Sequence, residues 1–164
     1  MKNKIFSEDE YNQAYRYCIS LSGDPDEAFD LLQASFEKLL KRGVEDLESP
    51  KLYLYRIIRN QFIDLRRKDK TWRFNEFHEE TNIIHLNSDR FDDILATKDE
   101  VETLMKSMSP EERELIYLSA VEGYSVTEMS ELSGTPRGTL LSKLHRLKLR
   151  LKKQFPNKTA EQTG

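Results

Sequence analysis

The chain has 164 residues, of which 37% are hydrophobic and 34% charged, and its formal net charge is −3. A single cysteine, Cys18, excludes an internal disulfide framework. The opening residues lack the apolar stretch of a secretory signal, and no long charge-free run follows, so we expect a cytoplasmic protein without membrane insertion. The length suits one domain or two small helical ones.

Charge is distributed unevenly along this acidic chain. Residues 56–73 hold seven Lys or Arg and two Asp, whereas residues 74–114 hold twelve acids and four bases. Residues 137–153 hold seven Lys or Arg and no acid. Two basic segments separated by an acidic one predict two nucleic-acid-binding surfaces.

Two helices are predicted in the first 43 residues. Ser7 with Glu10 forms a capping box that opens a helix to about Leu21. Asp24-Pro25 opens a second helix, which ends at Gly43. We expect its apolar face to fill a core, and its polar face is by itself explained by solvation. The expected core positions are Ala28, Leu31, Leu32, Phe36, Leu39 and Leu40. The outer positions are Asp24, Glu27, Asp30, Gln33, Glu37 and Lys41.

Ser49-Pro50 opens a third helix that carries aromatic and basic side chains together. Its expected core face consists of Leu54, Ile58, Phe62 and Leu65. Another face carries Tyr53, Arg56, Asn60 and Arg67. Rings among cations suit single-stranded nucleic acid, because bases stack on rings while cations follow phosphates. The alternative, in which the tyrosines cover the core edge and the arginines are solvated, stays open.

The remaining chain divides by composition. Residues 71–98 are largely acidic and lack a sustained helical period, which indicates a flexible linker. We therefore predict a domain at 1–70, the linker at 71–98, a second domain at 99–155 and a tail at 156–164.

The second domain has the helix start and stop signals of a helix-turn-helix. Ser109-Pro110 opens a helix that stops at Gly123, and Ser125 with Glu128 opens another that Gly134 closes. Thr135-Pro136 starts a third helix almost at once, so the turn is short, as in a helix-turn-helix.

This last helix carries two stripes. Leu140, Leu144, Leu147 and Leu151 form an apolar stripe for packing on the two preceding helices. Thr139, Lys143, Arg146 and Arg150 form a second stripe. A helix with one-sided positive charge suits the major groove of DNA, and the alternative is an ordinary solvated amphipathic helix.

Both halves resemble one protein family. GYSVTEMSELSGTPRGTLLSKLHRLKLRLKK resembles region four of bacterial RNA polymerase sigma factors, and is most similar to their extracytoplasmic-function (ECF) class. DPDEAFDLLQASFEKLLKR resembles region 2.2, and LYLYRIIRNQFIDLRRK resembles regions 2.3 and 2.4. The resemblance covers roughly Phe6 to Phe155 and implies an all-α protein of two small helical domains joined by a linker.

The resemblance also implies three sets of site residues. Docking on the β′ clamp helices of core RNA polymerase would involve Asp24, Glu27, Asp30, Leu31, Gln33 and Phe36. Reading and melting of the −10 element would involve Tyr53, Tyr55, Arg56, Arg59 and Asn60. Reading of the −35 element would involve Arg137, Thr139, Ser142, Lys143 and Arg146.

Some positions depart from the family pattern. Leu141 stands where many members carry a second Lys or Arg, and Tyr53 replaces a frequent Trp but keeps a ring. Lys143 replaces a common Arg, which weakens the expectation of bidentate guanine reading there, because lysine offers a point charge rather than a fork.

The function expected from the resemblance is non-enzymatic. The protein would bind core RNA polymerase, direct it to promoter DNA, and need no cofactor or metal, with an anti-sigma factor as a further candidate partner. The alternative is a helix-turn-helix regulator that uses only Ser109–Phe155, with the first half as an input or dimerisation module. An enzyme is disfavoured because the sequence shows no nucleophile–base pair, metal cluster or phosphate-binding glycine loop.

Overall fold

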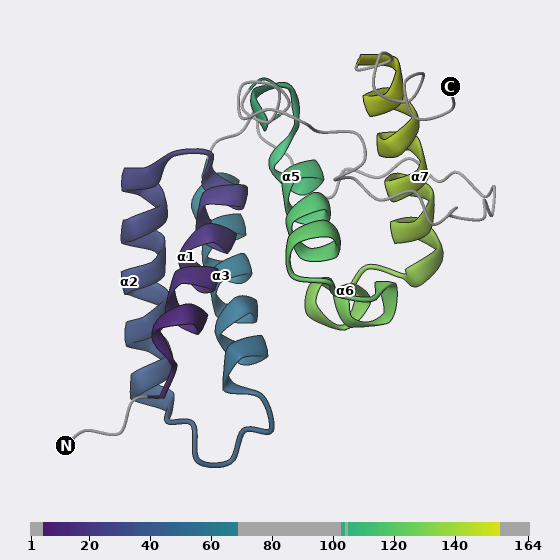
Figure 1. Ribbon diagram of the computed structural model, residues 1–164. Coiled ribbons are helices and arrows are strands. Elements are labelled where there is room, and N and C mark those ends of the chain that lie inside the picture. Colours follow the sequence, from purple (N-terminus) through teal and green to yellow (C-terminus); the bar gives the residue numbers. More distant parts are fainter. Residues whose placement is uncertain (1–4, 69–102, 104, 155–164) are drawn as a thin grey trace. The chain divides into compact units, whose positions relative to one another are not determined.

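The computed structural model describes residues 5–68, 103 and 105–154, and the chain divides into two compact units, Met1–Asn75 and Glu76–Gly164 (Figure 1). Every regular element among the described residues is helical. The expected all-α fold with two helical domains is confirmed. The predicted linker and the predicted boundaries near residues 70, 98 and 155 lie outside the described residues and stay predictions.

Three helices build the first unit: α1 (Glu8–Ser22), α2 (Pro25–Arg42) and α3 (Pro50–Arg67). Each packs on the other two (Figure 1). Their starts lie where the sequence predicts them, because Ser7, Asp24 and Ser49 each accept a hydrogen bond from a backbone N–H of the first turn. At Ser7 the capping box is complete, since its own N–H donates to Glu10 Oε1 at 3.0 Å.

The core of the first unit is built around two stacked rings. Tyr17 of α1 and Tyr55 of α3 lie 4.4 Å apart with an interplanar angle of 11°, and both are fully buried. Cys18 follows Tyr17 in the sequence, and burial raises the pKa of its thiol. The remaining fully buried large side chains of this unit are Leu21, Leu32, Leu39, Leu54, Ile58 and Phe62.

Two leucines expected in this core lie at the surface instead. Leu40 is 53% exposed, because it follows the buried Leu39 directly and therefore lies about 100° around the helix from it. Leu65 is 49% exposed and lies in the last turn of α3, where fewer neighbouring side chains cover it. The expectation that these two leucines are core residues was wrong.

The second unit contains α5 (Pro110–Ile116), the π-helical turn η2 (Tyr117–Val121), α6 (Val126–Ser133) and α7 (Arg137–Gln154) (Figure 1). The capping boxes at Ser109 and Ser125 form as predicted. The first helix does reach the turn at Gly123, but its last part is π-helical rather than α-helical. There the N–H of Glu122 donates to the carbonyl of Tyr117 at 3.0 Å, five residues back.

The turn between α6 and α7 is short and internally bonded. Gly134 adopts a left-handed conformation with φ of 75°, which glycine tolerates without a Cβ clash. The Ser130 hydroxyl donates to the carbonyl of Thr135 at 2.7 Å, which fixes the chain just before α7 begins. Helices α6 and α7 pack together, and the four leucines of the predicted apolar stripe on α7 are all buried. The predicted helix-turn-helix geometry is therefore present.

Candidate protein and nucleic-acid interfaces

The outer face of α2 contains both polar and apolar side chains. Asp30 and Gln33 are exposed, as the resemblance requires of residues that contact a partner. Phe36 is half-buried, and Leu31 is buried in the core of the first unit. Only part of the predicted docking set is thus available at the surface.

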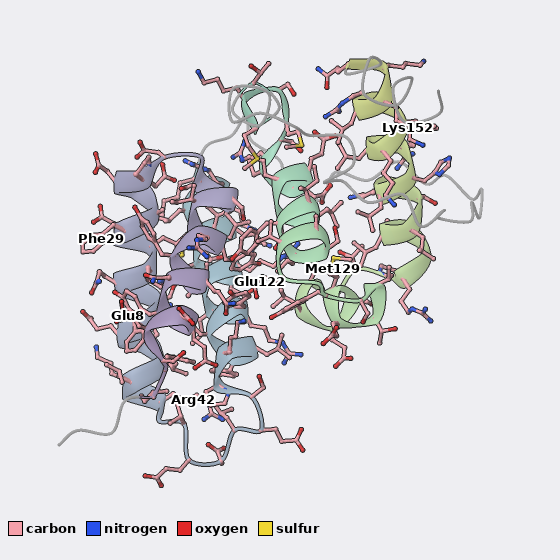
Figure 2. The ribbon with its side chains drawn as sticks, viewed as in Figure 1. Glu8, Phe29, Arg42, Glu122, Met129 and Lys152 are labelled. Carbon is pink, nitrogen blue, oxygen red and sulfur yellow. The ribbon has the colours of Figure 1, made fainter. Side chains whose placement is uncertain are left out.

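Two apolar residues complete this outer face and were not expected there from the sequence. Phe29 and Leu40 are each 53% exposed, and Phe29 projects outward from α2 (Figure 2). Together with Gln33 and Phe36 they follow a spacing of four, three and four residues, which places them on one helix face. The α2 outer stripe is hereafter Phe29, Gln33, Phe36 and Leu40.

A signal for this stripe exists in the sequence. Apolar residues of α2 occur in adjacent pairs, Ala28 with Phe29 and Leu39 with Leu40. One member of each pair belongs to the buried face, and the other lies about 100° away. Leu31 and Leu32 form a third such pair and are both buried, so this signal indicates a second apolar face without identifying its residues.

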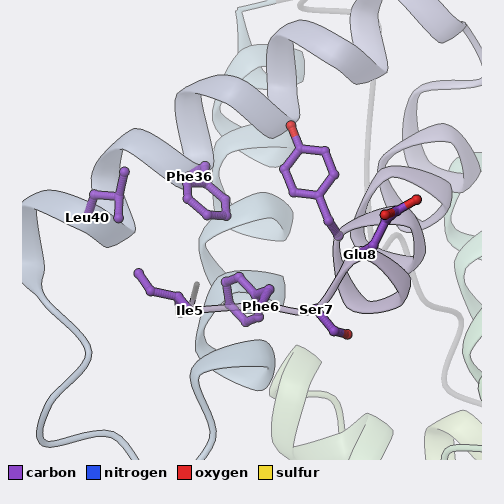
Figure 3. Close-up of a pocket in the computed structure, with 7 residues that line it drawn as sticks. Ile5, Phe6, Ser7, Glu8, Phe36 and Leu40 are labelled. Atoms are coloured by element: carbon purple, nitrogen blue, oxygen red, sulfur yellow. The ribbon is translucent and has the colours of Figure 1, made fainter. Parts of the chain in front are cut away.

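The α2 outer stripe continues into a shallow groove of about 360 Å³ at the start of α1 (Figure 3). The Phe36 ring lies 5.7 Å from Phe6, at 68°, and 5.9 Å from Tyr11. The Gln33 amide donates to the Tyr11 hydroxyl at 3.0 Å, which ties α2 to α1 beside the groove. The groove is lined by Ile5, Phe6, Ser7, Glu8, Tyr11, Phe36 and Leu40.

The other acids of the predicted docking set have structural partners within the first unit. Asp24 caps α2, accepting from the N–H of Glu27 at 2.9 Å. The Glu27 carboxylate pairs with the Arg66 guanidinium of α3. Both acids therefore hold the start of α2 in place.

Tyr53, the predicted base-stacking residue of α3, carries a cation over its ring. The Arg42 guanidinium lies 4.7 Å from the ring centroid, at cation–π distance. Arg42 is held in turn by both carboxylate oxygens of Asp46, at 2.9 and 3.1 Å. These hydrogen bonds raise the pKa of Arg42 and lower that of Asp46, so both groups are charged at neutral pH.

The other predicted −10 residues separate into surface and core positions. Arg56 and Asn60 are exposed, whereas Tyr55 is fully buried and Arg59 is 4% exposed. The physical reason is that α3 packs against both α1 and α2, so its buried face is wider than a single stripe. Sequence spacing alone does not distinguish these two groups.

The predicted −35 residues on α7 also differ in exposure. Arg137 is exposed, Thr139 and Arg146 are half-buried, and Ser142 is buried. Lys143 forms an ion pair with Glu111 of α5, with Nζ and Oε1 2.6 Å apart. About two turns further along α7, Arg150 makes two hydrogen bonds to Glu112, at 2.7 and 2.9 Å.

Glu112 is therefore bonded on two sides. Burial alone would raise its pKa, but hydrogen bonds from the Arg150 guanidinium and from the backbone and hydroxyl of Ser109 outweigh burial, and the net pKa lies below the usual range. The carboxylate is ionised at neutral pH and links the start of α5 to α7.

Two kinds of site are absent from the residues that the structure describes. Within them, no group of three or more His, Cys, Asp or Glu side chains is arranged to hold a metal ion. Among the described helices, none combines the length and apolar composition that crossing a bilayer requires.

Comparison with known proteins assigns the two units separately. Residues 6–73 match the family model for sigma-70 region 2, and residues 98–151 match the model for sigma-70 region 4. The two matches do not overlap, follow the order of the chain, and together span most of it.

Individual relatives agree with these matches. The ECF RNA polymerase sigma factor SigE of Mycolicibacterium smegmatis is 25% identical over 155 residues, covering 92% of this chain and 60% of that protein. The RNA polymerase sigma factor YlaC of Bacillus subtilis is 25% identical over 171 residues, covering 99% of each chain. The chain thus spans the full length of one relative and about three-fifths of the other.

A solved structure shows the same fold. The Bartonella quintana sigma factor RpoE, crystallised in complex with the anti-sigma factor NepR, matches with a TM-score of 0.63 and 24% identity. The match covers 88% of this chain and 90% of RpoE.

Proposed function

Because this chain belongs to the extracytoplasmic-function class of the sigma-70 family, we infer that it is a transcription initiation factor that directs core RNA polymerase to promoters. One observation carries this function: a region 2 match and a region 4 match occur in that order on one chain. A helix-turn-helix regulator would account for α6 and α7 but leaves the region 2 match unexplained. The protein acts without enzymatic chemistry of its own and works in the cytoplasm, where the polymerase is.

The α2 outer stripe is the proposed docking surface for the β′ clamp helices of the polymerase. Phe29 and Leu40 expose apolar area to water, and burying such area against a partner releases about 25 cal/mol per Å². Asp30 and Gln33 supply polar contacts at the edge. Asp24, Glu27 and Leu31 support this surface from within the fold rather than forming its contact area, whereas the half-buried Phe36 belongs to the stripe itself.

The exposed face of α3 is the proposed −10 surface. Tyr53 offers a ring for an unpaired base, while Arg56 and Asn60 reach the solvent on the same helix. Tyr55 and Arg59 act indirectly, because they are buried and hold α3 against its neighbours. Arg42 covers the Tyr53 ring from one side, so a base stacks on the other.

Helix α7 is the proposed −35 reading helix. Arg137 lies exposed in its first turn, close to N–H groups that favour a phosphate, and Arg146 lies further along. Thr139 is half-buried on the same helix, Ser142 is buried and acts indirectly, and Lys143 of the expected set pairs with Glu111. An anti-sigma factor is proposed as an additional partner, since the RpoE neighbour was crystallised with one.

Complex formation with core polymerase tests the docking proposal. The full chain should elute with purified bacterial core polymerase on gel filtration. Phe29→Ala combined with Leu40→Ala should weaken this association, as should charge reversal at Asp30 combined with Gln33→Ala. Lys38→Ala, an exposed change on the opposite side of α2 from the stripe, serves as the matched control and should leave it unchanged. Equal binding by all these variants would place the docking surface elsewhere.

A further inference from the structure

One cation of the reading helix is already neutralised within the protein. The ammonium group of Lys143 lies 2.6 Å from a carboxylate oxygen of Glu111, and the two side chains are only 10% and 18% exposed. This ion pair joins α7 to the first turn of α5, which is 32 residues away in the sequence. Lys143 is one of the residues that the family resemblance assigns to −35 DNA.

The position of the acid is fixed by the local fold. Glu111 lies in the first turn of α5, which begins at the capping box of Ser109 and Glu112. The adjacent Glu112 holds Arg150 with two hydrogen bonds, so two successive acids of α5 each engage a cation of α7. The start of α5 cannot move away from Lys143 without breaking the second pair.

Separating the Lys143–Glu111 pair is unfavourable in free energy. Removing one partner from a mostly buried ion pair leaves the other charge uncompensated in a poorly solvated position. An exposed phosphate offers Lys143 a partner in water of high dielectric constant, where an ion pair contributes little. Lys143 therefore stays with Glu111 when DNA approaches.

We propose that Glu111 is a specificity-determining residue of the −35 interface, because it withholds Lys143 from the DNA phosphates and so limits sequence-independent attraction. Phosphate contacts position a protein without reading bases, and each one adds to non-specific binding. The helix then depends more on its remaining contacts to distinguish promoter from other DNA. This inference rests on the proposed role of α7 in reading DNA.

A double-mutant cycle on the full chain tests the proposal. The variants are Glu111→Gln, Lys143→Gln and the two together, and the probe is a short fluorescent duplex of random sequence. Anisotropy titrations between 50 and 200 mM salt give the affinity at each salt concentration. The salt slope is the slope of log affinity plotted against log salt concentration. Thermal unfolding by circular dichroism confirms that each variant is folded.

Releasing Lys143 should add one phosphate contact. Glu111→Gln should therefore steepen the salt slope by about 0.9, which adds roughly a threefold loss of affinity over that salt range. Lys143→Gln should leave the slope unchanged, and the double variant should match the wild type in slope. The steeper salt slope of Glu111→Gln thus requires Lys143.

Two results would overturn the inference while leaving the proposed function standing. If Lys143→Gln alone flattens the slope by about 0.9, Lys143 contacts phosphate despite its partner. If Glu111→Gln raises affinity equally with and without Lys143, the acid acts by direct repulsion of DNA. If neither wild type nor any variant binds duplex at 50 mM salt, DNA reading by α7 is itself wrong.

Discussion

The Tyr53 ring is held in place by neighbouring side chains, which favours its proposed role in base stacking. The ring is covered on one side by Arg42, which Asp46 holds in place through two hydrogen bonds. A ring held in this way loses less conformational freedom when a base stacks on it. The loop between α2 and α3 thereby contributes to the proposed −10 surface, although neither Arg42 nor Asp46 belongs to the set implied by the family resemblance.

Substitution of Tyr53 should affect strand opening rather than duplex binding. Tyr53→Ala removes a stacking partner worth ~1–3 kcal/mol per base, so opening should fall by roughly fivefold to more than a hundredfold. Permanganate reactivity of unpaired thymines measures opening, and gel-shift titration measures the closed complex. Asn60→Ala should also reduce opening.

Two controls make this prediction sharper. Tyr53→Phe keeps the ring and should retain most of the opening. A promoter pre-melted by mismatches should restore much of the defect of Tyr53→Ala, and less of the defect of Asn60→Ala if Asn60 reads a base. Loss of closed-complex binding in Tyr53→Ala, with normal opening of the complexes that remain, would contradict the assignment.

Glu112 should make the second unit sensitive to acid. Its folded-state pKa lies below the usual value of a glutamate carboxyl, so its ion pair with Arg150 stabilises the fold fully above the pKa that the carboxyl has in the unfolded chain. The stabilisation is lost as pH falls through the folded-state pKa. Glu112→Gln should therefore lower the unfolding temperature at pH 7, and the difference from wild type should shrink in acid. A difference that stays constant from pH 7 to pH 3 would exclude this linkage.

At the scale of elements, the helix starts could be predicted because their determinants are local. Ser7, Asp24, Ser49, Ser109 and Ser125 each bond to a backbone N–H of their own first turn, within three residues. Glycines that accept positive φ end several of these helices. Such signals require no knowledge of the neighbouring helices.

Which side of each helix is buried depends on the neighbouring helices. The sequence therefore predicted the buried residues less well than the helix starts. Leu40 could not be distinguished from Leu39 by periodicity, because either could define the buried face until α1 and α3 select one. Tyr55 and Arg59 were expected at the DNA surface, yet α3 buries them because it contacts two helices. The Lys143–Glu111 pair joins residues 32 positions apart and has no local signature.

The leucine stripe of α7 offers a test of packing. Leu144 is buried, so Leu144→Ala should leave a cavity and cost about 2–5 kcal/mol of unfolding free energy. Leu149 is half exposed on the same helix, and Leu149→Ala should change stability by no more than about 0.5 kcal/mol. Urea unfolding followed by circular dichroism compares the two variants. Equal losses would mean that α7 does not pack through its predicted stripe.

At the scale of the whole molecule, two small helical units supply complementary surfaces. The first carries the α2 outer stripe and the exposed face of α3, and the second carries α7. Neither unit alone accounts for a protein that matches two successive regions of one family. In the proposed function, their combination on one chain lets the first unit bind polymerase and −10 DNA while the second reads the −35 element.

Transcription by purified core polymerase tests this claim most directly. Core polymerase with the full chain, supplied with genomic fragments from the organism that encodes it, should start transcripts at discrete sites. Mapped 5′ ends should share two upstream sequence elements, and core polymerase alone should give only scattered ends. If the chain adds no discrete starts by itself, and changes transcription only when another sigma factor is supplied, it is a regulator and the central claim is wrong.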